Sequence, residues 1–229
     1  MAVERGEFYS EVLVKICGTR TAEAAQVAVE SGADLIGMIM VPNLKRTVTV
    51  EQARAISDAV HKFSGEHFSH VGIGKDQWFA DHLDVVRKRA PLVVGVFRNQ
   101  SLNEILRIQR EANIDIVQLH GDEPIEWAEK IPVPVIKKFS PGEEDLHRPG
   151  FHAVSLLDGG SGGEGQKISW NDLPDTGEFF LAGGLTVDNV SEAVKVKNVR
   201  GVDVSSGVES DGKQDHEKIK QFITNAKGR

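Results

Sequence analysis

Eight short apolar segments alternate with amphipathic stretches along most of this chain, and no other feature constrains its fold as strongly. The apolar segments lie at 12–17, 34–40, 92–97, 115–119, 133–139, 153–157, 179–182 and 201–204. They are uniformly apolar, which is typical of parallel strands that are covered on their outer face. Eight strands in 229 residues leave about 29 residues for each unit, the length of one strand and one helix.

Between these strands, apolar residues recur at helical spacing. The predicted helices lie at 21–30, 50–62, 101–111, 124–130, 187–196 and 215–226. Eight units favour a closed (β/α)8 barrel, the TIM-barrel fold, over an open doubly wound sheet, which usually has about five or six strands. We therefore expect an α/β protein with a single (β/α)8 TIM-barrel domain over residues 1–229.

The segment at 63–90 is too long for an ordinary connection, and we expect it to be an insertion between the second helix and the third strand. Within it, the spacing predicts an extra helix at 77–88. Because the insertion follows a helix, we place it at the N-terminal end of the barrel, away from the catalytic end. Four histidines cluster there without the regular spacing of metal ligands, so we expect surface residues and no metal site. They are His61, His67, His70 and His82.

Composition excludes several classes of protein. The chain has 27 Lys and Arg against 34 Asp and Glu, a net charge of −7, whereas nucleic-acid and anionic membrane surfaces need clustered positive charge. The longest apolar stretch, 35–42, is far shorter than the roughly 20 residues of a membrane span, and residues 1–11 lack a signal-peptide core. The single cysteine, Cys17, excludes an internal disulfide. Without a signal peptide, a cytoplasmic protein is the default expectation. No helix face stands out as an interface, so we also expect a monomer.

Functional residues of a barrel follow its strands, which makes the strand ends the place to search. Lys15 and Cys17 end the first strand and share one face. Cys17 can be a base or a nucleophile if its thiol pKa is lowered; the alternative is a small buried apolar residue. After the second strand, Lys45 and Arg46 suit an anion, and Arg46 can grip a carboxylate through two parallel hydrogen bonds, unless this is a solvated basic turn. His120, after the fourth strand, is a candidate ligand contact.

Asp158 ends the sixth strand and precedes a glycine-rich run at 159–165. The run contains G-x-G-x-x-G at 160–165, the pattern of dinucleotide-binding loops, but such a loop opens a long helix. Here the next helix is short and is stopped by Pro174, so we expect no nucleotide cofactor. The run instead predicts a mobile lid, with Asp158 at its root as a candidate proton donor.

Small residues follow the last two strands: Gly183 and Gly184 after the seventh, and Ser205, Ser206 and Gly207 after the eighth. Without bulky side chains, the backbone N–H groups of such loops can approach a phosphate closely. The alternative is that the glycines serve only tight turns. Two such loops at these two places predict a phosphorylated small-molecule ligand.

These motifs together resemble those of the phosphoribosylanthranilate isomerase family, in its single-function fungal form. The matching stretches are 14–18, 41–47, 94–100, 115–123, 181–186 and 201–209. They occur in the family's order and cover nearly the whole chain outside 63–90.

The resemblance implies a cofactor-free Amadori rearrangement in tryptophan biosynthesis, from N-(5′-phosphoribosyl)anthranilate to 1-(2-carboxyphenylamino)-1-deoxyribulose 5-phosphate. By motif match, Asp158 is the acid that opens the furanose ring, and Cys17 is the base that takes the proton from C2′. The resemblance also implies that Arg46 binds the anthranilate carboxylate, that His120 and Asp203 contact the substrate, and that the two small-residue loops bind the phosphate. Such chemistry requires a raised pKa for the acid and a lowered pKa for the thiol.

Two alternatives stay open. Another phosphosugar barrel, an epimerase or an aldolase, would use the same phosphate loops; an aldolase needs a strand-end lysine for its Schiff base, and the obvious candidate, Lys15, lies deep in its strand. A noncatalytic or flavin-binding barrel would also use these loops, and a colourless purified protein would exclude the flavin.

Overall fold

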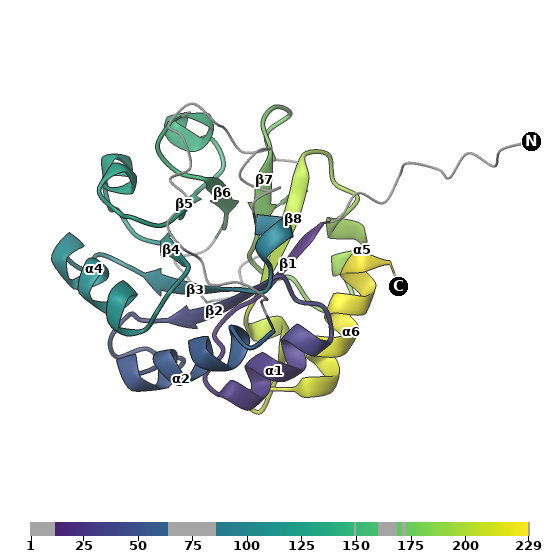
Figure 1. Ribbon diagram of the computed structural model, residues 1–229. Coiled ribbons are helices and arrows are strands. Elements are labelled where there is room, and N and C mark those ends of the chain that lie inside the picture. The colour runs from purple at the N-terminus through teal and green to yellow at the C-terminus, as the bar shows by residue number, and fades with distance from the viewer. Residues whose placement is uncertain (1–11, 64–85, 149, 160–168, 171–172, 229) are drawn as a thin grey trace, which may run out of the picture.

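Eight parallel strands close into a barrel in the computed structural model, which describes residues 12–63, 86–148, 150–159, 169–170 and 173–228 (Figure 1). The strands are β1 (Leu13–Ile16), β2 (Leu35–Ile39), β3 (Leu92–Phe97), β4 (Ile116–Leu119), β5 (Val135–Phe139), β6 (Val154–Leu157), β7 (Phe179–Leu181) and β8 (Val199–Val204). Each strand pairs with the next along the chain, and β1 pairs with β8 to complete the ring. The predicted (β/α)8 fold is confirmed.

Helices cover the outside of the barrel (Figure 1). They are α1 (Ala22–Glu30), α2 (Val50–Val60), α4 (Leu102–Glu111), α5 (Val190–Ala193) and α6 (His216–Lys227). Side chains fix where they begin: the hydroxyl of Thr21 accepts from the backbone of α1, and Thr49 and Gln52 form a reciprocal capping box at α2.

Short 3₁₀ helices and a small hairpin complete the described secondary structure. The 3₁₀ helices are η1 (Ile125–Glu129), η2 (Glu144–His147) and η4 (Ser206–Val208), and the hairpin strands are β9 (Glu209–Ser210) and β10 (Lys213–Gln214). The short helix predicted at 124–130 is present as the 3₁₀ helix η1, which follows Pro124. The helix predicted at 187–196 is shorter, because the Asn189 side chain accepts from the Thr186 N–H and closes a turn first.

The barrel encloses one apolar cluster and is wrapped by another. The inner cluster includes Leu13, Leu35, Leu92 and Phe180, while the outer one joins the strands to the helices. Gly201 leaves room for the Phe180 ring, since a Cβ there would lie 2.5 Å from a ring carbon. Apolar side chains thus fill the barrel's interior, and its buried polar side chains gather toward the C-terminal ends of the strands.

Two predicted features lie mainly outside the described residues: the insertion at 63–90, of which residues 64–85 are not described, and the glycine-rich lid beyond Gly159. Residues 86–89 are helical, as expected for the end of the extra helix. The prediction of a surface His61 is wrong: its side chain is 11 % exposed, and its Nε2 lies 2.8 Å from a carboxylate oxygen of Asp115. None of the helices in the described part of the chain has the length and apolar character needed to cross a bilayer.

Candidate active site

A buried ion pair lies at the end of β1. Lys15 and Asp203 are opposite each other where β1 pairs with β8, and the Lys15 ammonium donates to Asp203 Oδ1 at 2.9 Å. Lys15 is fully buried, and Cys17, on the same face of the chain, is 6 % exposed. A Cβ on Gly37 of β2 would lie 2.7 Å from Cys17 Sγ and 3.0 Å from Lys15 Nζ. Lys15, Cys17 and Asp203 therefore form one cluster, packed into the space that the missing side chain of Gly37 leaves.

The charges in this cluster act on the thiol in opposite directions. Burial raises the pKa of Cys17, because a poorly solvated thiolate is disfavoured; the Lys15 ammonium lowers this pKa, and the Asp203 carboxylate raises it. The expected positive neighbour is present, yet the net shift of the thiol pKa is upward. Burial alone would lower the pKa of Lys15, but Asp203 and Cys17 outweigh burial and raise it. A protonated lysine does not attack a carbonyl, which disfavours the aldolase alternative.

Arg46, from the loop between β2 and α2, grips a carboxylate of the protein itself. Its Nε and Nη2 donate to the two oxygens of Glu209 at 2.7 and 2.8 Å. This pairing, led by the hydrogen bond, raises the pKa of Arg46 and lowers that of Glu209. Among the described residues, no hydrogen bond involves Arg46 Nη1, whose two N–H groups are left for another acceptor. The neighbouring Lys45 is exposed, as in a solvated turn.

Glu209 is a site residue that sequence reasoning missed. It stands at the end of the motif at 201–209, but nothing in its local pattern indicates a partner 163 residues away. Glycine brings this region together: a Cβ on Gly18 would lie 2.7 Å from Arg46 Cδ and 2.9 Å from Ser205 Oγ. Arg46 therefore lies next to the loop that follows β8.

His120 and Asp158 meet across the mouth of the barrel, with His120 Nε2 lying 3.6 Å from Asp158 Oδ2. Burial lowers the pKa of His120 to about 3, and nearby cations, Lys15 first among them, add to this effect. The imidazole is therefore neutral near pH 7. Gln118 Nε2 lies 2.9 Å from His120 Nδ1, an arrangement that assigns the ring proton to Nε2, on the side of Asp158.

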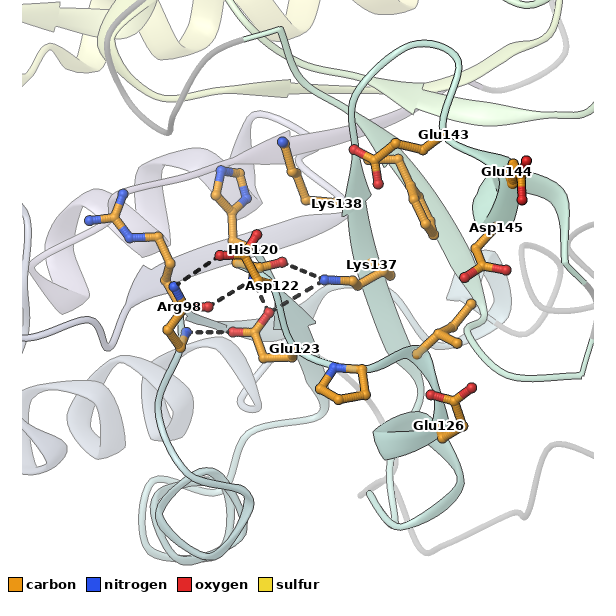
Figure 2. A pocket seen from close by; sticks show the side chains of 15 residues that line it. Arg98, His120, Asp122, Glu123, Glu126, Lys137, Lys138, Glu143, Glu144 and Asp145 are labelled. Atoms are coloured by element: carbon orange, nitrogen blue, oxygen red, sulfur yellow. Dashed lines mark hydrogen bonds and ion pairs between the residues drawn. The ribbon is translucent and has the colours of Figure 1, made fainter.

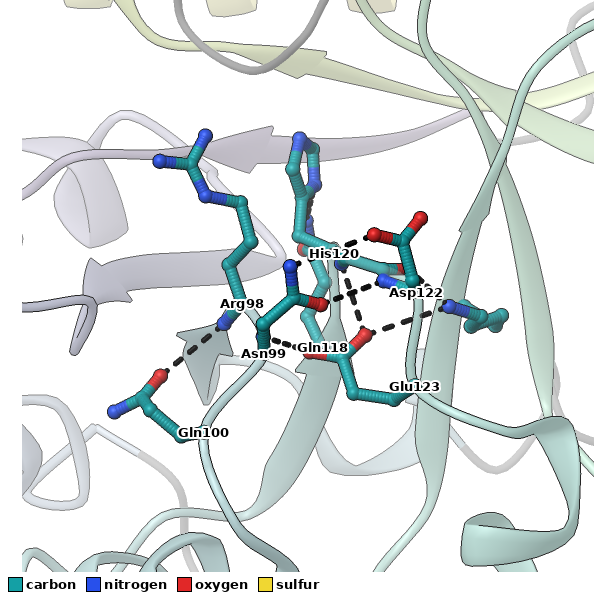
Figure 3. A network of polar contacts seen from close by, with 9 residues as sticks. Arg98, Asn99, Gln100, Gln118, His120, Asp122 and Glu123 are labelled. Carbon is teal, nitrogen blue, oxygen red and sulfur yellow. Dashed lines mark hydrogen bonds and ion pairs between the residues drawn. The ribbon is translucent and has the colours of Figure 1, made fainter.

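A polar network holds the loop that carries His120 (Figure 3). The buried Glu123 carboxylate accepts from the backbone N–H groups of Asn99 at 2.7 Å and Gly121 at 2.9 Å, and it lies 3.4 Å from Lys137 Nζ. Asn99 in turn accepts from the N–H of Asp122 at 2.8 Å. These contacts join the ends of β3, β4 and β5 and fix the position of His120. Sequence reasoning missed this network, because its partners are far apart in the chain.

A pocket of about 680 Å³ opens beside this network (Figure 2). Its lining includes His120 but not Cys17, Arg46 or Asp158. Arg98, His120 and Lys138 lie along one part of its wall, and Glu143 and Asp145 lie on another (Figure 2). Across residues 12–63, 86–148, 150–159, 169–170 and 173–228, no three side chains are grouped as ligands for a metal ion.

The loops after β7 and β8 lie against each other. Gly183 and Gly184 have φ angles of +85° and +68°, which other residues rarely adopt. A Cβ on Gly207 would lie 1.9 Å from a carbonyl oxygen of the β7 loop, so only glycine fits there. The Ser205 hydroxyl is buried without a hydrogen-bond partner among the described residues, and the exposed Ser206 begins η4. Such an unsatisfied donor is what a bound anion would engage.

Comparisons with known proteins agree with this picture. The family model described as "N-(5'phosphoribosyl)anthranilate (PRA) isomerase" matches residues 64–225. The chain is 58 % identical over 227 residues to an N-(5′-phosphoribosyl)anthranilate isomerase of Lipomyces starkeyi, covering 94 % of this chain and 95 % of the relative. It is 46 % identical to a multifunctional tryptophan biosynthesis protein of Schizosaccharomyces pombe, covering 98 % of this chain and 31 % of that protein.

Solved structures share the fold. A crystal structure of phosphoribosyl anthranilate isomerase in complex with reduced 1-(o-carboxyphenylamino)-1-deoxyribulose 5-phosphate matches with a TM-score of 0.68. The identity is 34 %, and the match covers 95 % of this chain and all of the other.

Proposed function

The chain belongs to the N-(5′-phosphoribosyl)anthranilate isomerase family, and we propose that Cys17 and Asp158 perform its proton transfers. It is an isomerase of tryptophan biosynthesis that converts N-(5′-phosphoribosyl)anthranilate into 1-(2-carboxyphenylamino)-1-deoxyribulose 5-phosphate by an Amadori rearrangement.

Asp158 acts as the acid. It donates a proton to the furanose ring oxygen while the bond from that oxygen to C1′ breaks and the anthranilate nitrogen forms a double bond to C1′. The position supports this role: Asp158 is buried at the end of β6, and His120 Nε2 lies 3.6 Å from its carboxyl group. A neutral His120 can donate to the carboxylate that remains after proton transfer.

Cys17 acts as the base. Its thiolate takes the proton from C2′ of the Schiff base, and the electron pair moves through C1′ to the nitrogen, giving an enol. The enol hydroxyl then loses its proton while C1′ takes one up, which gives the ketone of the product. The nearby Lys15 ammonium supports this role, because a positive charge favours a thiolate in a site from which water is excluded.

The charged ends of the substrate are bound on the β8 side. Arg46, held by Glu209, binds the anthranilate carboxylate through its remaining N–H groups. Gly183, Gly184, Ser205, Ser206 and Gly207 bind the phosphate. The observation that best supports the phosphate site is the buried hydroxyl of Ser205, which has no hydrogen-bond partner among the described residues. It lies in one of two adjoining loops whose backbone requires glycine at 183, 184 and 207. That Asp203 contacts the substrate stays a prediction.

The direct test feeds phosphoribosylanthranilate to the purified protein and follows the product by chromatography. We expect conversion by the wild type and loss of turnover in Asp158→Asn, whose amide has no proton to release to the ring oxygen. Because the variant keeps the shape of the site, it should still bind the reduced product analogue. Wild-type turnover in Asp158→Asn would show that the acid lies elsewhere.

We also propose that the protein acts in the cytoplasm as a monomer of one barrel domain, on a phosphorylated small molecule. The surface supports this: within the described residues, the exposed large apolar side chains are Leu44 and Phe63. Sedimentation velocity across a range of concentrations tests the monomer, and a concentration-dependent shift to a larger species would contradict it.

A further inference from the structure

The ammonium group of Lys15 is enclosed in the barrel beside the chain's single cysteine. Burying a charge costs free energy, which a single ion pair often does not recover. Lys15 transfers no proton in the reaction proposed above, and below it the barrel is filled by apolar side chains such as Leu13 and Leu35. An apolar residue at position 15 would stabilise the fold as well as this ion pair does. The buried charge therefore points to a role in the reaction.

We propose that Lys15 and Asp203 are positioning residues that set the charge state of Cys17, with Lys15 favouring the thiolate and Asp203 opposing it. The inference rests on the proposed function, in which Cys17 is the base. Asp203 has two effects: its carboxylate holds the ammonium at 2.9 Å, and it repels a thiolate.

Three charged side chains lie near the thiol. Lys15 approaches from its own strand, Asp203 from β8 and Arg46 from the loop after β2. On β2, Gly37 contributes no side chain, so nothing from that strand separates the sulfur from the ammonium. The Gly18 N–H also donates toward the sulfur. Lys15 and Asp203 therefore affect the thiol with opposite signs, as their charges and contacts require.

Because the chain has one cysteine, the thiol can be titrated directly. The ultraviolet absorbance of the thiolate is recorded against pH, with Cys17→Ser as the blank. Four proteins are compared: the wild type, Lys15→Met, Asp203→Asn, and the double variant Lys15→Met/Asp203→Asn. A fifth, Lys227→Met, is the control, because it breaks another ion pair, with Asp34, at the opposite end of the barrel.

The expected midpoints follow one order. The midpoint of the thiol titration in Asp203→Asn lies below that of the wild type, because the Lys15 ammonium is freed to pair with the thiolate. The midpoint of Lys15→Met lies highest, by about 1–3 pH units, because the Asp203 carboxylate stays beside the thiol while the ammonium is lost. The midpoint of the double variant lies between those of the wild type and Lys15→Met. It loses both effects on the thiol, and the effect of Lys15 is the larger. Lys227→Met matches the wild type, and the acidic limb of the kcat/KM profile moves in the same order.

Equal midpoints, or shifts of Lys15→Met and Asp203→Asn in the same direction, would overturn the proposal. If Lys15→Met does not fold, because it leaves Asp203 without its partner, the double variant and Asp203→Asn still decide the order. The titration needs no substrate. An expected order of midpoints together with full turnover in Cys17→Ser would reject Cys17 as the base while leaving the electrostatic inference intact.

Discussion

We propose single residues at the strand ends for the proton transfers, and their environments differ sharply. Cys17 lies beside a cation, Lys15, in a site whose burial raises its thiol pKa. His120 is neutral near pH 7, because burial lowers the pKa of its imidazole to about 3. Residue type alone would have made the histidine the obvious base, and the structure argues against that choice.

At this scale, Cys17→Ser tests the base. A hydroxyl is a far weaker base than a thiol near neutral pH, so kcat should fall by about 10²–10⁴-fold while KM changes little. Steady-state kinetics measure both, and circular dichroism verifies the fold. A variant with a kcat near that of the wild type would exclude Cys17 from this role.

Arg46→Ala tests the binding of the substrate carboxylate. Loss of a charge-assisted hydrogen bond should weaken substrate binding by about 1.5–3 kcal/mol, seen mainly in KM. Glu209→Gln should have a smaller effect of the same kind, because it loosens the guanidinium without removing it. Lys45→Ala, next to Arg46 but exposed, is the matched control. If all three variants bind substrate alike, Arg46 does not hold the carboxylate.

At the scale of the elements, strand β2 contributes by leaving space. Cys17 and Lys15 occupy the volume that a side chain on Gly37 would need. The loops after β3 and β4 act differently, since the Glu123 carboxylate binds them together and so positions His120. Strands and loops thus determine where the candidate site residues lie.

Gly37→Ala tests the role of β2. The added methyl group would lie 2.7 Å from Cys17 Sγ, so the thiol must move; overpacking of this kind costs about 1–3 kcal/mol of stability. We expect a loss of kcat beyond that of Gly201→Ala, whose methyl group meets the Phe180 ring instead. Activity and urea unfolding are measured for both. If Gly37→Ala and Gly201→Ala lose the same stability and also the same activity, Gly37 does not have this role.

At the scale of the whole molecule, folding buries titratable groups that are exposed to water in the unfolded chain. His152 is 3 % exposed, and its Nε2 lies 2.8 Å from Ser155 Oγ, which donates to the Leu146 carbonyl. Its Nδ1 has no hydrogen-bond partner among the described residues. Burial lowers the pKa of His152 to about 4, because a charged imidazole is poorly solvated there.

This shift predicts how stability depends on pH. In the unfolded chain, His152 takes up a proton as the pH falls below about 6.5, whereas the folded protein resists protonation until about pH 4. Stability is therefore fully present above pH 6.5 and declines toward pH 4, by up to about 3 kcal/mol from this group.

Urea unfolding at several pH values, for the wild type and His152→Gln, measures the effect. The variant should lose less stability than the wild type between pH 6.5 and pH 4, since it has no imidazole to protonate. Parallel curves for the two proteins would show that another group causes the acid sensitivity.

The sequence by itself determined the eight strands, the barrel they form, and the strand ends at which the candidate site residues lie. Apolar runs and helical spacing are local patterns, so they can be recognised without knowing what packs against what. The same holds for Cys17 and Asp158 at strand ends and for the glycines after β7 and β8. The tertiary structure alone decided the partners: Lys15 with Asp203, 188 residues away, and Arg46 with Glu209, 163 residues away. The first pair depends on the register in which β1 meets β8, and the second depends on loops that converge only when the barrel closes. Neither can be recognised from a local sequence pattern.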